Sequence, residues 1–217
     1  MIKQCIVIGA LACTSTIHTA KEIELKISLA NKKYLLLEKW FKQHAHYSGV
    51  SQQTEWYVTS PNDEWDYSAG FKDTLTTIRV RHEAKGDSYC YKYRHLDPVT
   101  KKTTHRDEYE TPIADGNKML TYLAGLGYTQ TTLVKKERHT YLFNEFEIVV
   151  DQVQGIGKFV EIELKEQVDD VKVGLSKIEN LLRAIGIAEF VQYDRGYIHM
   201  IWNPGYNFGE RRNLSNN

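Results

Sequence analysis

In the stretch Lys21-Glu22-Ile23-Glu24-Leu25-Lys26-Ile27, charged and apolar residues alternate from Glu22 onward. In a β-strand successive side chains point to opposite faces, so Glu22, Glu24 and Lys26 share one face and the aliphatic residues share the other. Taken alone, such a stretch is typical of an edge strand with one solvated face. The same pattern returns in Glu161-Ile-Glu-Leu-Lys165. The strands between the two stretches therefore decide which way the charged faces point.

The composition predicts one large domain with no net charge. The chain has 217 residues, with 28 Lys plus Arg and 28 Asp plus Glu, and a chain of this length buries a substantial core. A neutral balance gives no long-range attraction to nucleic acid or to an anionic membrane. A polyanion would have to be bound by a local cluster of cations. The three cysteines, at positions 5, 13 and 90, lack the spacing of a disulfide framework or a zinc site.

The two ends of the chain fall outside the predicted domain of residues 21–202. Residues 1–20 form a leader or an extra N-terminal segment with an apolar run, Cys5–Cys13, after Lys3. This outline resembles a secretory signal with cleavage near Ala20, but a buried strand or disordered leader is favoured because only one cation precedes the run. We expect a cytoplasmic protein, with secretion left open, and no membrane span because the run is too short. Residues 203–217 predict a loose polar tail.

Between these ends the sequence predicts eight strands joined mostly by hairpin turns. The strands are expected at 21–27, 52–58, 77–83, 89–94, 104–111, 129–143, 147–151 and 159–165. Helices are expected at 31–44, 115–125 and 171–185, and an aromatic closing segment at 190–202. The strands and helices do not alternate as they would in a parallel sheet, so the fold class is α+β with an antiparallel sheet or barrel.

The charged faces of these strands are grouped by sign. The basic pairs are Arg79/Arg81, Lys92/Arg94 and Lys136/Arg138, and the acidic pairs are Glu22/Glu24, Glu108/Glu110 and Glu161/Glu163. If the sheet closes with its apolar face outward under the helices, the charged face lines a polar tunnel. Burying so many charges is costly unless they pair or hold a charged ligand. A solvated face would show random signs, whereas grouping suits a polyphosphate beside a divalent metal.

Glu22-Ile-Glu24-Leu-Lys26 resembles the ExExK signature of the CYTH superfamily, the triphosphate tunnel proteins that include class IV adenylyl cyclases and thiamine triphosphatases. Lys136-Glu-Arg-His-Thr-Tyr141, followed by the segment 150–163, resembles the cyclase-type branch in order and spacing. The resemblance covers residues 21–202. It implies an eight-stranded antiparallel β-barrel with flanking helices, in which basic residues bind the triphosphate and acidic residues bind Mg²⁺ or Mn²⁺.

Carried over position by position, the resemblance implies roles for individual residues. The implied catalytic residues are Glu22, Glu24 and Lys26. The implied triphosphate ligands are Arg79, Arg81, Lys92, Lys136 and Arg138. The implied metal ligands are Glu22, Glu24, Asp151, Glu161 and Glu163. Four further residues are either tunnel ligands or structural ion pairs: Arg94, Arg106, Glu108 and Glu110.

The resemblance predicts a metal-dependent enzyme acting on a triphosphate. In a cyclase the ribose 3′-oxygen of ATP attacks the α-phosphorus, giving cyclic AMP and pyrophosphate; in a triphosphatase water attacks the terminal phosphorus and releases orthophosphate. The cyclase-type segment Asp151–Glu163 favours cyclisation. A non-catalytic nucleotide or polyphosphate binder is a third alternative, with little use for carboxylates. Nucleic-acid binding is disfavoured because carboxylates interrupt the basic residues, and the sequence leaves a homodimer open.

Overall fold

The computed structural model describes residues 20–62, 65–68 and 70–216, so the expectations for the leader lie outside the described residues. The strands are β1 (Ala20–Ser28), β2 (His46–Thr59), β3 (Thr76–Glu83), β4 (Gly86–Leu96), β5 (Thr103–Ile113), β6 (Thr129–Phe143), β7 (Phe146–Val153), β8 (Gly157–Leu164), β9 (Glu189–Tyr193) and β10 (Gly209–Asn213). The helices are α1 (Asn31–His44), α2 (Gly116–Gly125), α3 (Val171–Ile185) and α4 (Tyr197–Trp202). Among the described residues, none of the helices has the length and apolar character that crossing a membrane requires.

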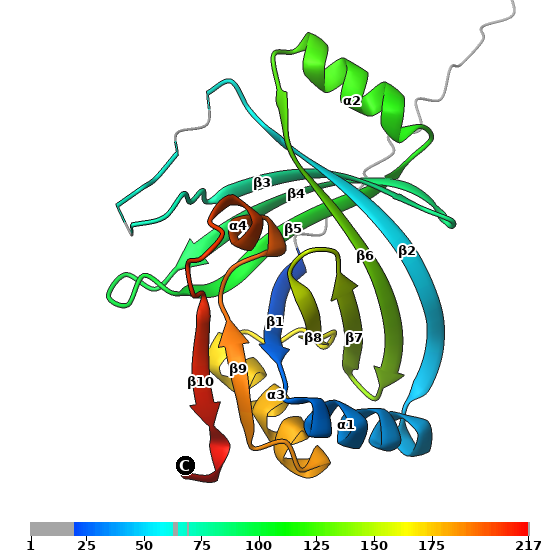
Figure 1. Ribbon diagram of the computed structural model, residues 1–217, viewed down its shortest axis with the longest axis vertical. Helices are drawn as coiled ribbons and strands as arrows, with labels where there is room; N and C mark the ends of the chain where they lie inside the picture. The colour runs from blue at the N-terminus through cyan, green and yellow to red at the C-terminus, as the bar shows by residue number, and fades with distance from the viewer. Residues whose placement is uncertain (1–19, 63–64, 69, 217) are drawn as a thin grey trace, which may run out of the picture.

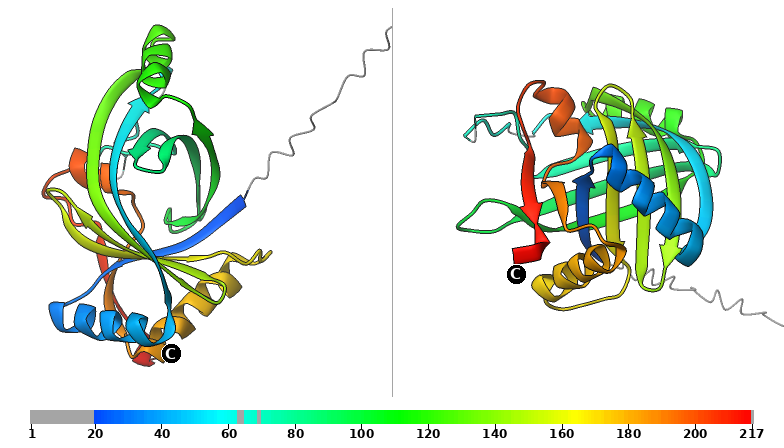
Figure 2. Two further views of the ribbon diagram at one scale, coloured as in Figure 1. Left: turned by 90° about the vertical axis from the view of Figure 1, so that its right-hand side faces the viewer. Right: turned by 60° about the horizontal axis from the view of Figure 1, so that its bottom comes forward.

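Eight of the strands form a closed antiparallel barrel, as the sequence predicts (Figures 1 and 2). Their order is β1-β5-β4-β3-β2-β6-β7-β8, and β8 pairs with β1 to close the ring. The first residues of β1 pair with β5, while Ile23–Ile27 pair with β8 and Lys26–Ser28 pair with β9. The last two strands of the chain, β9 and β10, therefore lie outside the ring and extend the sheet from β1.

The main core lies outside the barrel, between its wall and two helices. Aliphatic side chains from β1, β7 and β8 pack against α1 and α3, which cover this part of the wall. The fully or nearly fully buried contributors include Ile27, Leu37, Phe41, Ile148, Ile162, Ile178 and Leu182. A Cβ on Gly174 would lie 2.9 Å from the Ile23 side chain, so this glycine permits the close approach of α3 to β1. The apolar face of β1 points outward and its charged face points into the barrel.

The boundaries of α2 and α3 follow from local capping. Asp170 accepts a hydrogen bond from the backbone N–H of Lys172 at the start of α3, and Gly186 ends it with a left-handed φ of 87°. Asp115 caps α2 in the same way through the N–H of Lys118. α2 covers a smaller apolar cluster on β2 and β3.

Two regions differ from the expectations. β2 begins at His46 rather than residue 52, because it pairs with β6 along most of that strand, from His46 to Thr59. The expected loose tail contains β10, which pairs with β9 from Gly209 to Asn213. Backbone pairing explains this difference, since a polar segment without alternation can still form an edge strand when its partner offers unpaired backbone groups.

Candidate active site in the barrel lumen

The interior of the barrel, called the lumen below, holds a cavity of about 440 Å³. Its lining comes from strands all around the ring and from α4. The structure brings fourteen of the sequence-predicted site residues to this one cavity: Glu22, Glu24, Lys26, Arg79, Arg81, Lys92, Arg94, Arg106, Glu108, Glu110, Lys136, Arg138, Glu161 and Glu163. Alternation along each strand places them there, because lumen-facing and outward-facing residues alternate in a barrel.

Three of the cations meet at Glu55, which the sequence pattern did not single out. Glu55 is fully buried, and its Oε1 lies 2.9 Å from Arg81 Nε, 3.2 Å from Lys136 Nζ and 3.4 Å from Arg79 Nη1. Burial alone would raise the pKa of Glu55, but the charges of Lys136, Arg79 and Arg81 outweigh it and hold the pKa well below its usual range. Glu55 therefore stays ionised and fixes the positions of three predicted triphosphate ligands.

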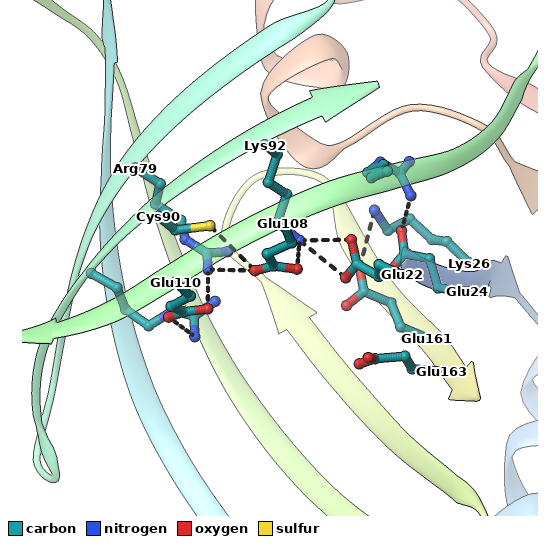
Figure 3. Close-up of polar contacts among 12 residues, drawn as sticks. Glu22, Glu24, Lys26, Arg79, Cys90, Lys92, Glu108, Glu110, Glu161 and Glu163 are labelled. Atoms are coloured by element: carbon teal, nitrogen blue, oxygen red, sulfur yellow. Dashed lines mark hydrogen bonds and ion pairs between the residues drawn. The ribbon is translucent and has the colours of Figure 1, made fainter. Parts of the chain in front are cut away.

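Glu108 and Glu110 bridge the cations of β3 and β4 (Figure 3). Glu108 Oε2 lies 2.7 Å from Lys92 Nζ, and Glu110 lies 3.1 Å from Arg79 and 3.4 Å from Arg81. Burial opposes ionisation of Glu110, but Arg79 and Arg81 lower its pKa to about 2. Both carboxylates line the lumen and both form ion pairs.

Cys90 lies beside these carboxylates on β4, with its Sγ 3.2 Å from Glu108 Oε1. Burial raises the pKa of the Cys90 thiol to about 12. Without a bound cation the thiol is therefore protonated and donates a hydrogen bond to Glu108.

β1 connects to both sides of the lumen through ion pairs. Glu22 lies 3.1 Å from Lys92, and Lys26 Nζ lies 3.0 Å from Glu161 Oε1. Glu24 pairs with Arg106 of β5. In β1, the first strand of the barrel, Glu22, Glu24 and Lys26 thus face inward and contact β4, β5 and β8.

The part of the barrel wall formed by β1, β8 and β7 carries a row of carboxylates. Glu24 of β1 and Glu147 of β7 are each directly opposite Glu163 of β8. Like charges directly opposite each other are destabilising in a sheet. Burial, together with Glu22 and Glu24, raises the pKa of Glu163 to about 7, although a hydrogen bond from Lys165 opposes the shift. We call Glu24, Glu163 and Glu147 the carboxylate row.

Asp151, one of the predicted metal ligands, has different surroundings from the others. Its side chain is fully buried and does not line the cavity. Arg138 donates to both of its oxygens, at 2.7 and 2.5 Å, and the Tyr197 hydroxyl donates at 2.9 Å. This two-pronged pairing orients the guanidinium of Arg138, whose Nη2 also lies 2.6 Å from Glu161. Asp151 acts as the support of a lumen cation.

α4 and the segment before β3 also contribute to the lining of the lumen. Asp73 lies 2.7 Å from Arg94, 3.3 Å from Arg195 and 2.9 Å from His199 Nε2, and all four side chains are buried. Burial opposes ionisation of Asp73, but hydrogen bonds from His199 and Arg94 lower its pKa. Burial lowers the pKa of His199. Asp73, Arg195 and His199 lie in segments without periodicity, so the sequence pattern does not predict them as site residues.

The fold and the site define a charged-tunnel protein, a closed antiparallel barrel whose cavity is lined by nine Lys or Arg and seven Glu side chains of the described residues. The chain belongs to the CYTH domain family, whose model matches residues 20–197. The resemblance seen in the sequence is thereby confirmed.

Individual proteins resemble this chain in sequence or in fold. The chain is 22% identical over 190 residues to a Methanocaldococcus jannaschii protein named "Putative adenylate cyclase", covering 82% of this chain and 97% of the relative. A solved Pyrococcus horikoshii structure is 24% identical with a TM-score of 0.63, covering 83% of this chain and 97% of that one. A Hippeastrum structure, described as a "Putative adenylyl cyclase" with "a dominant triphophatase activity", is 16% identical with a TM-score of 0.58, covering 83% and 93%. The two solved structures support the fold.

Proposed function

We propose that the protein is a metal-dependent enzyme that acts on a triphosphate bound in the lumen. The observation that carries the proposal is the division of the lumen into two regions of different charge. The cations of β3 and β6 gather around Glu55 of β2. In the carboxylate row on β1, β8 and β7, by contrast, like charges face each other. The first region suits phosphate oxygens and the second suits a cation.

The triphosphate would lie among the cations named from the sequence. Arg79, Arg81 and Arg138 offer planar guanidinium groups that bind phosphate oxygens in pairs, and Lys92 and Lys136 add point charges. Buried carboxylates already hold four of these side chains in place, since Glu55 contacts Arg79, Arg81 and Lys136, and Asp151 contacts Arg138. Preorganised charges of this kind stabilise phosphoryl transfer without rearrangement during the reaction.

The carboxylate row fits a hard divalent cation. Its donors are carboxylate oxygens, which Mg²⁺ and Mn²⁺ prefer, and Glu22 lies beside them on β1. We assign metal binding to Glu22, Glu24 and Glu163, with Glu161 shared with Lys26 and Arg138. The metal would neutralise phosphate charge and support activation of the nucleophile. Lys26, which contacts Glu161 across the β1–β8 pair, would then face the reacting phosphate.

Cyclisation of ATP to cyclic AMP and pyrophosphate is the reaction we propose first. The cyclase-type segment around Asp151–Glu163 and the name of the Methanocaldococcus relative support it. Triphosphate hydrolysis is the second candidate, supported by the activity named for the Hippeastrum protein. The same cations and carboxylates serve both reactions, because the choice depends on which phosphorus lies beside the nucleophile.

The purified chain should be incubated with ATP, inorganic triphosphate or thiamine triphosphate, each with Mg²⁺ or Mn²⁺, and the products separated. Cyclic AMP with pyrophosphate would support the first reaction, and orthophosphate the second. Lys26→Met should remove the activity, whereas Lys158→Met is a matched control, since Lys158 pairs with Glu38 outside the lumen. Binding without any product would contradict the proposed enzyme and indicate a binder.

A further inference from the structure

We propose a second metal site on the outer face of the barrel, formed by His95, His105 and Asp107 and suited to a borderline divalent cation such as Zn²⁺. These residues alternate with Arg94 and Arg106, which line the lumen. Successive side chains of a strand point to opposite faces, so the three lie on the outside of β4 and β5. The site does not depend on the proposed reaction.

The strand register brings the three side chains together. His95 is directly opposite His105, and Asp107 follows His105 by two residues on the same face. One ligand atom from each residue lies within 4.8 Å of the other two. His95 Nε2 is 2.7 Å from Asp107 Oδ2, and the two imidazole rings stack with centroids 4.2 Å apart.

Small side-chain rotations would complete the site. Two ligands bound to Zn²⁺ at ~2.0–2.1 Å in a tetrahedron lie roughly 3.3 Å apart. The His95–Asp107 contact would open slightly and His105 would turn toward it. All three residues are partly exposed, so these rotations do not disturb a packed core. A water molecule would supply the fourth ligand.

A hydrogen-bond relay sets the tautomer of His105. The Thr104 hydroxyl lies 3.3 Å from the His95 carbonyl, to which it donates, and 3.0 Å from His105 Nδ1. Because the hydroxyl has one proton, it accepts from Nδ1–H, and the lone pair of His105 is then on Nε2. Metal-binding histidines characteristically have such an outer partner on the second ring nitrogen.

The donor set separates this site from the lumen. Two imidazoles and one carboxylate suit Zn²⁺, Co²⁺ or Ni²⁺, whereas the all-oxygen carboxylate row suits Mg²⁺ or Mn²⁺. A second outward histidine offers a matched comparison: His139 Nε2 lies 3.1 Å from Glu137 and its Nδ1 contacts the Tyr47 hydroxyl at 2.9 Å. It is not part of a three-ligand group among the described residues.

The test is a calorimetric titration of the metal-stripped full chain with Zn²⁺, in excess Mg²⁺ to occupy the lumen. We expect one tight site that weakens more than about 100-fold in His95→Gln, His105→Gln and Asp107→Asn, because each change removes a direct ligand. His139→Gln should bind Zn²⁺ as the parent does. Circular dichroism of each metal-free variant checks that it is folded.

Co²⁺ gives a second readout that a nonspecific surface interaction would not produce. We expect the intense visible absorption of tetrahedral Co²⁺ in the parent and in His139→Gln, and its loss in the three site variants. The proposal is overturned if folded His105→Gln retains the parent's Zn²⁺ affinity, if Co²⁺ shows no tetrahedral spectrum, or if His139→Gln abolishes binding.

Discussion

Glu110 and Glu163 are chemically identical side chains that line the same cavity, yet they occupy opposite electrostatic environments. Glu110 lies between Arg79 and Arg81, which lower its pKa to about 2 against the effect of burial. Glu163 lies between Glu24 and Glu147 on the neighbouring strands, and burial with nearby carboxylates raises its pKa to about 7.

The charged groups around each carboxylate, together with its burial, therefore set its charge state; a place in the lumen does not decide it. A carboxylate between arginines has its charge already compensated inside the protein. A carboxylate between carboxylates gains from binding a proton or a divalent cation. The comparison predicts that the same Glu→Gln change has different consequences at the two positions.

The largest expected difference is in turnover. Glu163→Gln should lower kcat by at least about 100-fold and raise the metal concentration needed for half-maximal activity, because it removes a direct metal ligand. Glu110→Gln should change the KM for the triphosphate while leaving that metal concentration unchanged, because its partners are arginines. Steady-state kinetics with varied Mn²⁺ and varied substrate measure both quantities.

A matched control for this pair lies on the outer face, where Glu137 contacts His139 and Gln52. Glu137→Gln should alter neither the metal requirement nor the KM. If Glu110→Gln raises the metal requirement as much as Glu163→Gln does, the division of the lumen into two regions is wrong.

The next effect concerns stability on the basic side. Glu55→Ala would leave the buried Arg79 and Lys136 and the partly buried Arg81 without their shared carboxylate, and breaking a buried pair costs roughly 3–5 kcal/mol. Urea unfolding monitored by tryptophan fluorescence should show the loss as a lower midpoint. Glu147→Ala should not destabilise the metal-free protein, because it removes one of three facing carboxylates. Equal destabilisation by the two changes would contradict the comparison.

Much of the fold follows from local sequence rules. The alternation in Lys21–Ile27 is sufficient to place β1 and to give its two faces. Helix α3 has the predicted boundaries, Val171 and Ile185, because Asp170 caps its start and Gly186 stops it. β6 also has its predicted boundaries, Thr129 and Phe143.

The rest depends on contacts between distant segments. Glu55 is a single carboxylate in its strand, and its role arises only because the register sets it opposite Arg81. Asp73 and His199 are more than a hundred residues apart in segments without periodicity, so their contact depends on the closed fold. Asp151 has the same alternation as the lumen residues, and nothing local shows that Arg138 and Tyr197 would enclose it.

The pH dependence of stability should also differ between the two carboxylates. Glu163 has a folded pKa of about 7 against an ordinary value of 4.5. Between these values the folded chain holds a proton that the unfolded chain releases, so this residue's contribution falls as pH rises from 4.5 to 7. Glu110, with a pKa of about 2, contributes fully above 4.5 and loses its contribution as pH falls toward 2.

These opposite slopes can be isolated as differences between the parent and each Glu→Gln variant in metal-free buffer with a chelator. Urea unfolding at several pH values should show a decline on the order of 1–3 kcal/mol for Glu163 between pH 4.5 and 7. The difference for Glu110 should be flat over the same interval. A flat profile for Glu163 would show that its carboxyl is not enclosed by like charges.

The smallest expected effect tests how Glu110 is held. The Ser88 hydroxyl donates to Glu110 Oε1 at 2.6 Å, and a hydrogen bond to a charged group contributes about 1.5–3 kcal/mol when buried, less at this partly exposed position. Ser88→Ala should therefore destabilise the parent by about 1 kcal/mol in urea unfolding. The effect should vanish in a Glu110→Ala background but persist, within ~0.5 kcal/mol, in Glu163→Gln, which lies across the lumen. If the effect of Ser88→Ala depends on Glu163 instead, the two regions of the lumen are coupled. The charge state of Glu110 is then not independent of the charge state of Glu163.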